Sequence, residues 1–482
     1  MVLSNRRYRG RGLAALPQRR EPASSAWPAD LSHLKKRCTV MVPFACLTIL
    51  ASCMSPPLGP QESQATDDGS LHVAPATVWI SVGEEKQLLY WVDGSEADSV
   101  DWTFTSSDPA IAAVTEDGRV NAKGPGKVKI SVSADVRGNG KKVGHHKRDD
   151  AVVVTVTDAA QEASIGMLLG VANLADTWQT LPYTRLYDSI FAKWSEEHWN
   201  ESGGNWGATY YDRGLGWYAA WWRTGDAKYL ERADIDIVAY RDEYILPNSG
   251  GVPPRWSNPE GLALHYLVTG DEQSREALAQ LADVQARTWL DNMMTTQYQD
   301  GRIQGRTVLT VLMADLVDAR PIRDWAADTR FGVDELIKWY EASGSDGSWD
   351  MKSYCNGQAN FQVAHALLEA LIRYYDLVEP DPRIPPIVKA SLDYMWEWWR
   401  ADDRALTYLT VACDNGGANP APDVNLLSVP PFGWYYQYSG DETYRTRGDA
   451  LFLGGLWRTF WSGNKQFNQS VMRSWRYPAQ TN

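Results

Sequence analysis

Three copies of a short turn divide the second half of the chain into helical segments. Residues 224–226 and 269–271 read Thr-Gly-Asp, and residues 439–441 read Ser-Gly-Asp. Apolar residues recur at helical spacing on both sides of each turn. Glycine favours the left-handed conformation that ends a helix, and aspartate caps the start of the next one. Each copy therefore predicts a helical hairpin whose apolar face needs neighbouring hairpins to cover it.

The hairpins repeat along the chain from about residue 160. A fourth hairpin spans residues 363–396, and two less clear units lie around 165–200 and 304–343. Repeats of roughly 40 to 50 residues that are each a helix pair predict a solenoid or a closed ring. We expect six hairpins to close into a ring, with an open helical solenoid that only binds as the alternative. The polar and aromatic residues 463–477 are expected to fold back and close the ring.

Residues 216–233 show the form of the repeated turn, GWYxxxxxTGDxxYxxxA. This form and the six repeats resemble the (α/α)6 toroid that many glycoside hydrolases and polysaccharide lyases share. The resemblance covers residues 160–465 of a domain that we assign to residues 160–482, and it is architectural. It implies an all-α toroid that acts on a carbohydrate, and it does not imply a particular sugar.

Residues 75–157 alternate apolar and polar residues with the period of two that β-strands have. Val128, Ile130 and Val132 would share one face of a strand, and turn residues interrupt the pattern about every ten residues, as in a small β-sandwich. The segment also resembles the bacterial Ig-like group 2 family, at Trp102, Ser107, Asp108, Pro109, Val114, Asp117, Gly118, Val120, Ala122 and Gly126. This resemblance implies a spacer or adhesion module without chemistry of its own.

The N-terminal part has the pattern of a bacterial export signal. Three basic residues, 35–37, precede an apolar run that is too short to span a bilayer permanently. The run ends in Leu-Ala-Ser-Cys, which resembles a lipobox. Residues 35–53 are therefore expected to be a lipoprotein signal peptide with Cys53 as the lipidated residue, or else a signal that is cleaved without lipidation. We interpret residues 1–34 as an extension from a misassigned start codon, and residues 54–74 as a tether that links a membrane anchor in the cell envelope to the first domain.

Composition narrows the possible partners. A formal net charge of -13 argues against nucleic acid, because phosphate binding needs a basic surface. The chain has 23 tryptophans, 19 of them after residue 170, and indoles stack on sugar rings as well as filling cores. Metal and cofactor motifs are not found, and we expect neither a metal nor a cofactor. Cys355 and Cys413 would remain after lipidation, either paired or as two buried thiols. The oligomeric state stays open.

In a ring of hairpins, the loops that enter the first helix of each pair meet at one mouth. Polar and aromatic residues precede five of these helices, and in number and type they exceed what helix capping requires. The candidates for substrate binding among them are Tyr211, Arg213, Arg255, Trp256, Arg302, Gln304, Arg306, Trp349, Asn356, Asn360 and Asn425. The same loops carry Asn258, Gln358, Asp414 and Asn415. We therefore predict a carbohydrate site at this mouth.

Hydrolysis of a glycosidic bond needs two carboxyl groups, one on each side of the bond. Asp212 and Glu260 come at the entry of consecutive first helices, and we expect them to be the catalytic pair. Asp423 and Asp350 are further candidates. The alternative is structural, with Asp212 paired to Arg213 or Arg255 and Glu260 serving only to begin its helix.

Elimination by a polysaccharide lyase needs a group that neutralises a uronate carboxylate and a base that removes the neighbouring proton. Tyr354 is the candidate base, and Asn356 with Arg306 and Arg302 the candidate neutralisers. His198 and His265 are alternative bases, although His265 lies among apolar residues typical of a hairpin core. Toroid lyases commonly carry a following β-sheet domain, and this chain ends soon after the sixth hairpin, so we expect hydrolysis.

Arginines in the same loops favour an acidic or unsaturated oligosaccharide as the substrate of such a hydrolase. Arg213, Arg255 and Arg306 would hold its carboxylate. A glycan-binding lipoprotein without catalysis is the third possibility, in which the aromatic residues bind sugar and the carboxylates only cap helices.

Overall fold

The computed structural model describes residues 70–93, 100–136, 146–170, 178, 182–293, 300–412 and 417–481. The predicted signal peptide with Cys53, the residues before it and nearly all of the predicted tether lie outside this range. Export and lipidation therefore stay predictions. None of the helices in the described ranges is long and apolar enough to cross a membrane.

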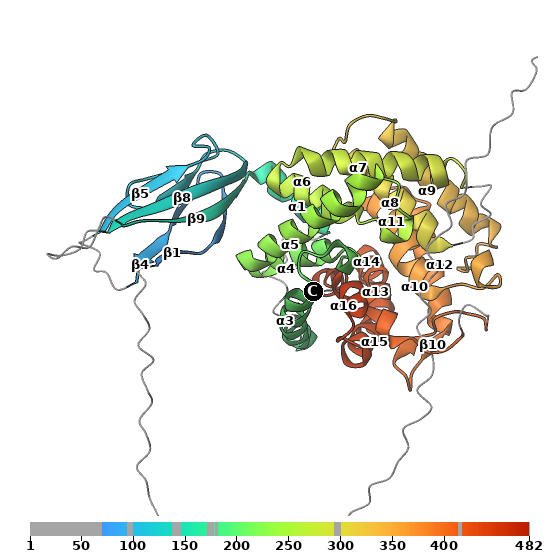
Figure 1. Ribbon diagram of the computed structural model, residues 1–482. Coiled ribbons are helices and arrows are strands. Elements are labelled where there is room, and N and C mark those ends of the chain that lie inside the picture. Colours follow the sequence, from blue (N-terminus) through green and yellow to red (C-terminus); the bar gives the residue numbers. More distant parts are fainter. Residues whose placement is uncertain are drawn as a thin grey trace, which may run out of the picture. The chain divides into compact units, whose positions relative to one another are not determined.

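The first described domain consists of β-strands (Figure 1). They are β1 (Leu71–Ala74), β2 (Thr77–Ser81), β3 (Glu85–Gln87), β4 (Leu89–Val92), β5 (Val100–Ser106), β6 (Ala112–Val114), β7 (Arg119–Ala122), β8 (Gly126–Val136) and β9 (His146–Thr157). The strands form a four-stranded sheet in the order β2-β9-β8-β5, a three-stranded sheet β3-β7-β6 and the pair β1-β4. Strand β1 lies within the range predicted as tether, so the sandwich begins before residue 75.

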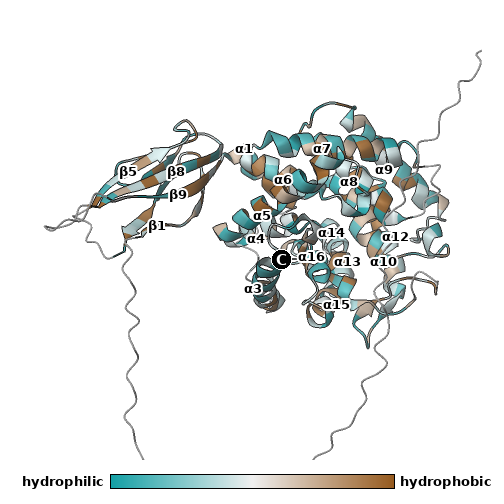
Figure 2. Ribbon diagram, in the orientation of Figure 1, coloured by the Kyte–Doolittle hydropathy of each residue, from teal (hydrophilic) through white to brown (hydrophobic). Residues whose placement is uncertain are grey.

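The sandwich core follows the alternation in the sequence. Strands β8 and β9 pair antiparallel from Gly126 opposite Val156 to Val136 opposite His146. Val128, Ile130 and Val132 of β8 are all buried, which confirms the predicted face. Figure 2 shows hydrophobic and hydrophilic residues alternating along these strands. Each inward side chain adds apolar burial at about 25 cal/mol per Å², so the pattern fixes which face of the sheet is the core.

Helices make up the second domain. They are α1 (Ala159–Leu169), α3 (Pro182–Ser202), α4 (Arg213–Thr224), α5 (Ala227–Tyr240), α6 (Pro259–Thr269), α7 (Glu272–Gln285), α8 (Gly301–Leu316), α9 (Trp325–Ala342), α10 (Asn360–Gln362), α11 (Glu369–Leu377), α12 (Ile384–Glu397), α13 (Asn425–Ser428), α14 (Pro430–Ser439), α15 (Glu442–Arg458), α16 (Asn464–Val471) and α17 (Arg476–Gln480). A π-helical segment, η8 (Val363–Leu368), joins α10 to α11. A short hairpin of β10 (Trp399–Arg400) and β11 (Ala405–Leu406) follows α12.

The three repeated turns have the predicted geometry. Gly225, Gly270 and Gly440 end α4, α6 and α14 with φ of 67°, 70° and 69°. The aspartate after each glycine accepts a hydrogen bond from a backbone N–H in the first turn of the next helix. Left-handed φ is strained for residues with a Cβ, so glycine at these positions sets where each hairpin turns. The three hairpin predictions are confirmed.

Six helix pairs of the described residues form a closed ring. Five pairs follow one another along the chain: α4 with α5, α6 with α7, α8 with α9, α11 with α12, and α14 with α15. The sixth pair joins α3 to α16, and α16 also contacts α4 and α13. A helix from the other end of the domain thus packs on α3, and much of the first half of the hairpin predicted at 165–200 lies outside the described residues. The predicted closure of the ring by residues 463–477 is confirmed, and the fold is the expected toroid.

Burial separates the two helices of each pair. Most residues of α4, α6 and α8 are buried around the whole helix, and α14 is buried from Pro430 to Tyr435 with an exposed last turn. In contrast, α5, α7, α9 and α15 have one buried and one exposed face. A helix that is buried on all sides lies in the interior, and an amphipathic one covers it. The inner helices therefore surround the ring axis, and the loops that enter them define what we call the mouth.

Candidate functional site at the mouth of the ring

Hydrogen bonds bring the segments that enter several inner helices together, as the sequence predicted. Asn468 Nδ2 donates to the carbonyl of Tyr210 at 2.9 Å, and Gln469 Nε2 donates to that of Asp423 at 2.6 Å. Arg306 Nη1 donates to the carbonyl of Arg255 at 2.9 Å. These bonds join the segments before α4, α6 and α13 to side chains of α8 and α16. Residues from opposite ends of the domain therefore meet in one place.

Four tyrosines gather there around one guanidinium. Arg302, in the first turn of α8, interacts electrostatically with Tyr211, Tyr210 and Tyr354, and its charge also acts on Tyr408. The rings of Tyr210 and Tyr211 lie 4.6 Å apart. Burial raises the pKa of Tyr354 to about 12 and raises that of Tyr211 further. These phenols are therefore protonated at neutral pH and can donate hydrogen bonds.

Two arginines lie at the mouth, and among the described residues Arg306 lacks the carboxylate partner that a buried arginine usually has. Arg306 is buried, donates to the carbonyls of Arg255 and Ser257, and lies 5.2 Å from the Tyr211 ring centroid. It forms no ion pair with any carboxylate of the described residues. Arg302 has Asp300 at 3.5 Å, and its buried Nε has no hydrogen-bond partner in the described part of the chain. The arrangement can hold an anion.

His365 lies beside these groups in the π-helical segment η8, and such segments are frequent at functional sites. Its ring is 5.9 Å from that of Tyr211 and stacks on Phe361 at 5.8 Å. Both ring nitrogens are buried and have no hydrogen-bond partner among the described residues. Burial lowers its pKa well below the usual value, and the charges of Arg306, Arg473 and Arg302 add to this effect. The imidazole is therefore neutral at physiological pH.

The carboxylate of Asp212 is buried and hydrogen-bonded to the backbone. The residue precedes α4 with a left-handed φ of 47°, and its carboxylate accepts the N–H groups of Leu215 at 3.1 Å and Gly261 at 2.9 Å. Burial, with the charge of Glu260, raises the pKa of Asp212 to about 6. Asp212 thus caps α4 and joins it to α6, and it pairs with neither Arg213 nor Arg255.

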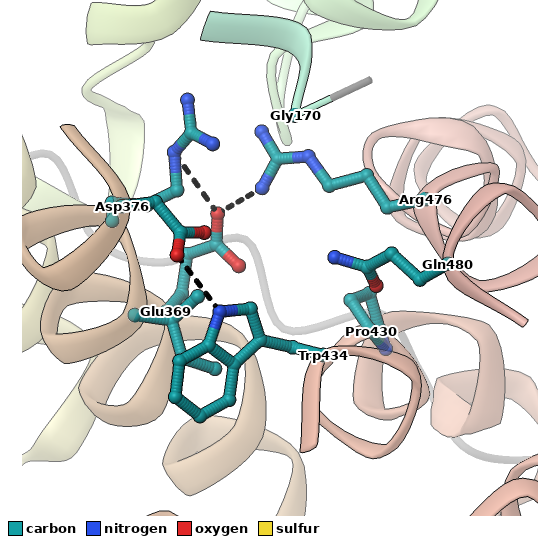
Figure 3. Close-up of a pocket in the computed structure, with 9 residues that line it drawn as sticks. Gly170, Glu369, Asp376, Pro430, Trp434, Arg476 and Gln480 are labelled. Atoms are coloured by element: carbon teal, nitrogen blue, oxygen red, sulfur yellow. Dashed lines mark hydrogen bonds and ion pairs between the residues drawn. The ribbon is translucent and has the colours of Figure 1, made fainter. Parts of the chain in front are cut away.

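Glu260 is fixed by arginines from the C-terminal part of the chain. Arg473 Nε lies 2.9 Å from one carboxylate oxygen and Arg476 Nη2 lies 3.1 Å from the other. Burial alone would raise the pKa of Glu260, but the two arginine charges outweigh it and lower the pKa to about 2. Glu369 contacts the same two arginines and Arg373. Figure 3 shows Arg476 and Glu369 turned toward each other. Glu260 is thus part of a buried ion network.

Several predicted binding residues belong to the interior instead of the mouth surface. Arg213 is fully buried and forms two hydrogen bonds with Asp236, at 2.7 and 2.8 Å. Trp349 is also fully buried, and its indole donates to Ser391 at 2.9 Å. Both predictions of substrate contact are corrected, because these fully buried side chains are hydrogen-bonded to partners inside the protein. Three further candidates are buried as well, namely Gln304, Asn360 and Asn425.

The remaining candidate residues differ in how far they are exposed to solvent. Arg255, Asp350 and Asn356 are exposed, and Trp256 and Asp423 are half-buried. Asp423 lies near Tyr408, since its charge adds to burial in raising the pKa of that phenol. Asn258 holds the backbone N–H of Asp212 through its side chain, and the side chain of Gln358 donates to Asn360. The two alternative bases are packed in the core, with His198 bonded to the Trp461 carbonyl and His265 to Ser274.

Sequence reasoning missed Tyr210, Tyr408, His365 and Gln362. Gln362 donates to the Tyr354 hydroxyl at 2.7 Å and comes three residues before His365. The signal that could have found them is the segment before the fifth first helix, where Asn360, Gln362 and His365 place polar groups in an otherwise apolar helix. A polar residue inside a buried helix needs a partner or a function.

Cysteines and metal ligands add little to the site. Cys355 is disulfide-bonded, but Cys413, Asp414 and Asn415 lie outside the described residues, so the pairing with Cys413 stays a prediction. Within the described ranges, no group of three or more His, Cys, Asp and Glu side chains is arranged to hold a metal ion.

Comparison with known proteins identifies the β-domain. Residues 69–145 match the family model of the bacterial Ig-like domain (group 2), which confirms the predicted family of that domain. No curated protein matches the chain.

Three solved structures are similar to this chain at low sequence identity. A sugar epimerase from a ruminal bacterium is 14% identical, with 57% of this chain and 86% of that chain covered and a TM-score of 0.43. A polysaccharide lyase is 12% identical, with 82% and 59% covered and a TM-score of 0.36. A family 76 glycoside hydrolase from a bovine Bacteroides thetaiotaomicron strain is 8% identical, with 86% and 98% covered and a TM-score of 0.33.

Proposed function

We propose that the helical domain is a carbohydrate-active enzyme that binds an acidic sugar at the mouth and cleaves the glycan by β-elimination. The observation that carries this proposal is the buried guanidinium of Arg306, which forms no ion pair with any described carboxylate, beside Arg302. An unpaired buried cation is costly, and an anionic ligand offsets that cost. The tyrosine rings around both arginines suit the apolar faces of a sugar.

Elimination requires a proton acceptor and a proton donor with well-separated pKa values. His365 is neutral and can accept the proton from the carbon next to the carboxylate. That C–H bond breaks, its electrons form the C=C bond, and the neighbouring C–O bond breaks. Tyr354 is protonated and donates its proton to the departing oxygen. This reverses the role that the sequence suggested for Tyr354, because its pKa is raised to about 12.

The negative charge of an acidic substrate makes His365 a stronger base. In the unliganded enzyme, the charges of Arg306, Arg473 and Arg302 oppose protonation of the imidazole. A bound carboxylate offsets the charges of Arg302 and Arg306, so the pKa of His365 rises when an acidic sugar binds. A neutral sugar would not produce this rise. Because the imidazole is buried against Tyr211, the Tyr211 ring must move aside for the substrate.

Product analysis tests the proposed reaction. We expect the enzyme to act on uronate-containing polysaccharides and to release products with the ultraviolet absorbance of an unsaturated uronate. Neutral glucans and mannans serve as substrate controls. Cleavage without this absorbance would instead support hydrolysis, which the raised pKa of Asp212, about 6, favours as the second candidate. In that case Asp212→Asn would abolish cleavage, whereas elimination predicts that it lowers stability. Absence of any cleavage leaves glycan binding as the function.

The pH profile separates the two possible bases. If His365 is the base, kcat/KM is flat between about pH 7 and pH 9, because the pKa of the unliganded imidazole is below its usual value and the imidazole is already neutral. If Tyr354 is the base, kcat/KM rises about tenfold per pH unit, because only the deprotonated phenol reacts and its pKa is about 12. Initial rates at low substrate concentration, with stability checked at each pH, measure this. A steep rise contradicts the assignment of His365.

A further inference from the structure

Four aromatic side chains form a continuous series of ring contacts that leads away from the tyrosine cluster. Trp206 and Tyr244 stack with centroids 4.1 Å apart and an interplanar angle of 7°. Trp256 lies 6.0 Å from Trp206 and 6.1 Å from Tyr244. Tyr210 is 4.5 Å from Trp256, and it contacts Tyr211 of the central site. We call Trp206, Tyr210, Tyr244 and Trp256 the aromatic rim.

The aromatic rim is not part of the closed core. All four side chains are half-buried, so each keeps accessible ring surface. They come from two connections at the mouth. Trp206 of η2 (Trp206–Ala208) and Tyr210 lie between α3 and α4, and Tyr244 of η3 (Arg241–Ile245) and Trp256 of η5 (Pro254–Trp256) lie between α5 and α6. Aromatic rings held by one another lose little freedom when a ligand stacks on them. The rim is therefore a preformed surface for the apolar face of a sugar.

An exposed arginine accompanies the rim. Arg255 is exposed, and its charge acts on Tyr244, where it opposes the larger effect of burial on the pKa of that phenol. The guanidinium forms no ion pair within the part of the chain that the structure describes. The protein has a formal net charge of -13, and most other arginines of the helical domain have a carboxylate partner among the described residues. Arg255 is therefore a second cation available to a ligand at the mouth.

We propose that the aromatic rim and Arg255 form a second sugar-binding subsite, so that the substrate is a chain with carboxylates on more than one sugar. The proposal rests on the proposed function, because it places the first carboxylate at Arg302 and Arg306. The rings contact the sugar face, and Arg255 contacts the carboxylate of a sugar beyond the one that is cleaved. The enzyme then prefers polymers to short oligosaccharides.

Affinity as a function of chain length tests this subsite. The probes are galacturonate oligosaccharides from the disaccharide to the octasaccharide, with isothermal titration calorimetry in the His365→Gln background so that the chains stay intact. We expect wild-type affinity to rise with length. Arg255→Gln should lower affinity for the octasaccharide about tenfold, with at most about a twofold change for the disaccharide, in line with one cation–sugar contact. Trp206→Ala should act in the same direction.

The matched control is Arg320→Gln, which removes one exposed arginine beyond the C-terminal end of α8, away from the mouth. It should leave affinity unchanged at every length. If the protein cleaves uronate chains but Arg255→Gln and Trp206→Ala bind all lengths like the parent protein, the second subsite is wrong and the proposed function stands. If binding depends on length and on Arg255 but nothing is cleaved, the subsite stands and the proposed function is wrong. If no oligosaccharide binds, both are wrong.

Discussion

Replacing His365 by glutamine lowers kcat for elimination by about 10² to 10⁴-fold, the range typical of general acid–base groups. Glutamine has a similar size and can donate and accept hydrogen bonds, but it cannot accept a proton at neutral pH. KM changes much less, because the arginines that hold the carboxylate are still present. Steady-state kinetics on a uronate-containing polysaccharide, followed by the absorbance of the unsaturated product, measures both constants. A kcat within about threefold of wild type contradicts the assignment.

His265 supplies a matched control for this prediction. It is also buried in an inner helix, α6, but its Nδ1 is hydrogen-bonded to Ser274 at 2.8 Å. His265→Gln should lower the unfolding temperature and leave kcat nearly unchanged. His365→Gln should show the opposite pattern, because no described residue is hydrogen-bonded to its ring. If both variants lose stability and neither loses kcat, the unpaired nitrogens of His365 have a structural role only.

The sequence predicted those parts of the fold that depend on local chemistry. Gly225 and Asp226 specify the end of one helix and the start of the next without reference to distant residues. The alternation around Ile130 similarly identifies the buried face of β8. The pairing of α3 with α16 was missed, because no local signal distinguishes an outer helix whose partner follows it from one whose partner is far along the chain.

The sequence predicted the location of the candidate site more accurately than the roles of its residues. The loops before the inner helices do meet, and Tyr211, Arg302, Arg306 and Tyr354 are brought together there. The role of each side chain depends on its burial and on its contact partners, and neither can be read from the sequence. An aspartate before a helix is equally suited to capping and to acid catalysis, and only the two backbone N–H groups that reach Asp212 distinguish these uses.

Buried arginines and glutamates in the ring interior form a network of ion pairs. Arg373, Arg473 and Arg476 face Glu260 and Glu369, and all five side chains are buried. Burial, together with the charge of Arg476, lowers the pKa of Arg373 to about 10. Removing one partner from such a network leaves an uncompensated charge that water cannot solvate. The network therefore holds the C-terminal segment, which carries two of the arginines, against α6 and α11.

Replacing Glu260 by glutamine is therefore expected to lower the free energy of unfolding by about 3 to 5 kcal/mol, the cost of breaking a buried ion pair. Equilibrium denaturation of the helical domain measures this change. Glu276→Gln is the control, because Glu276 pairs with Arg320 at the surface, where loss of a pair costs about 0 to 1 kcal/mol. A Glu260→Gln variant of wild-type stability that has lost all cleavage would identify Glu260 as a catalytic carboxylate and contradict its structural role. The pKa of about 2 argues for the structural outcome, since a carboxylate held in its charged form by two arginines is a weak base and cannot donate a proton at neutral pH.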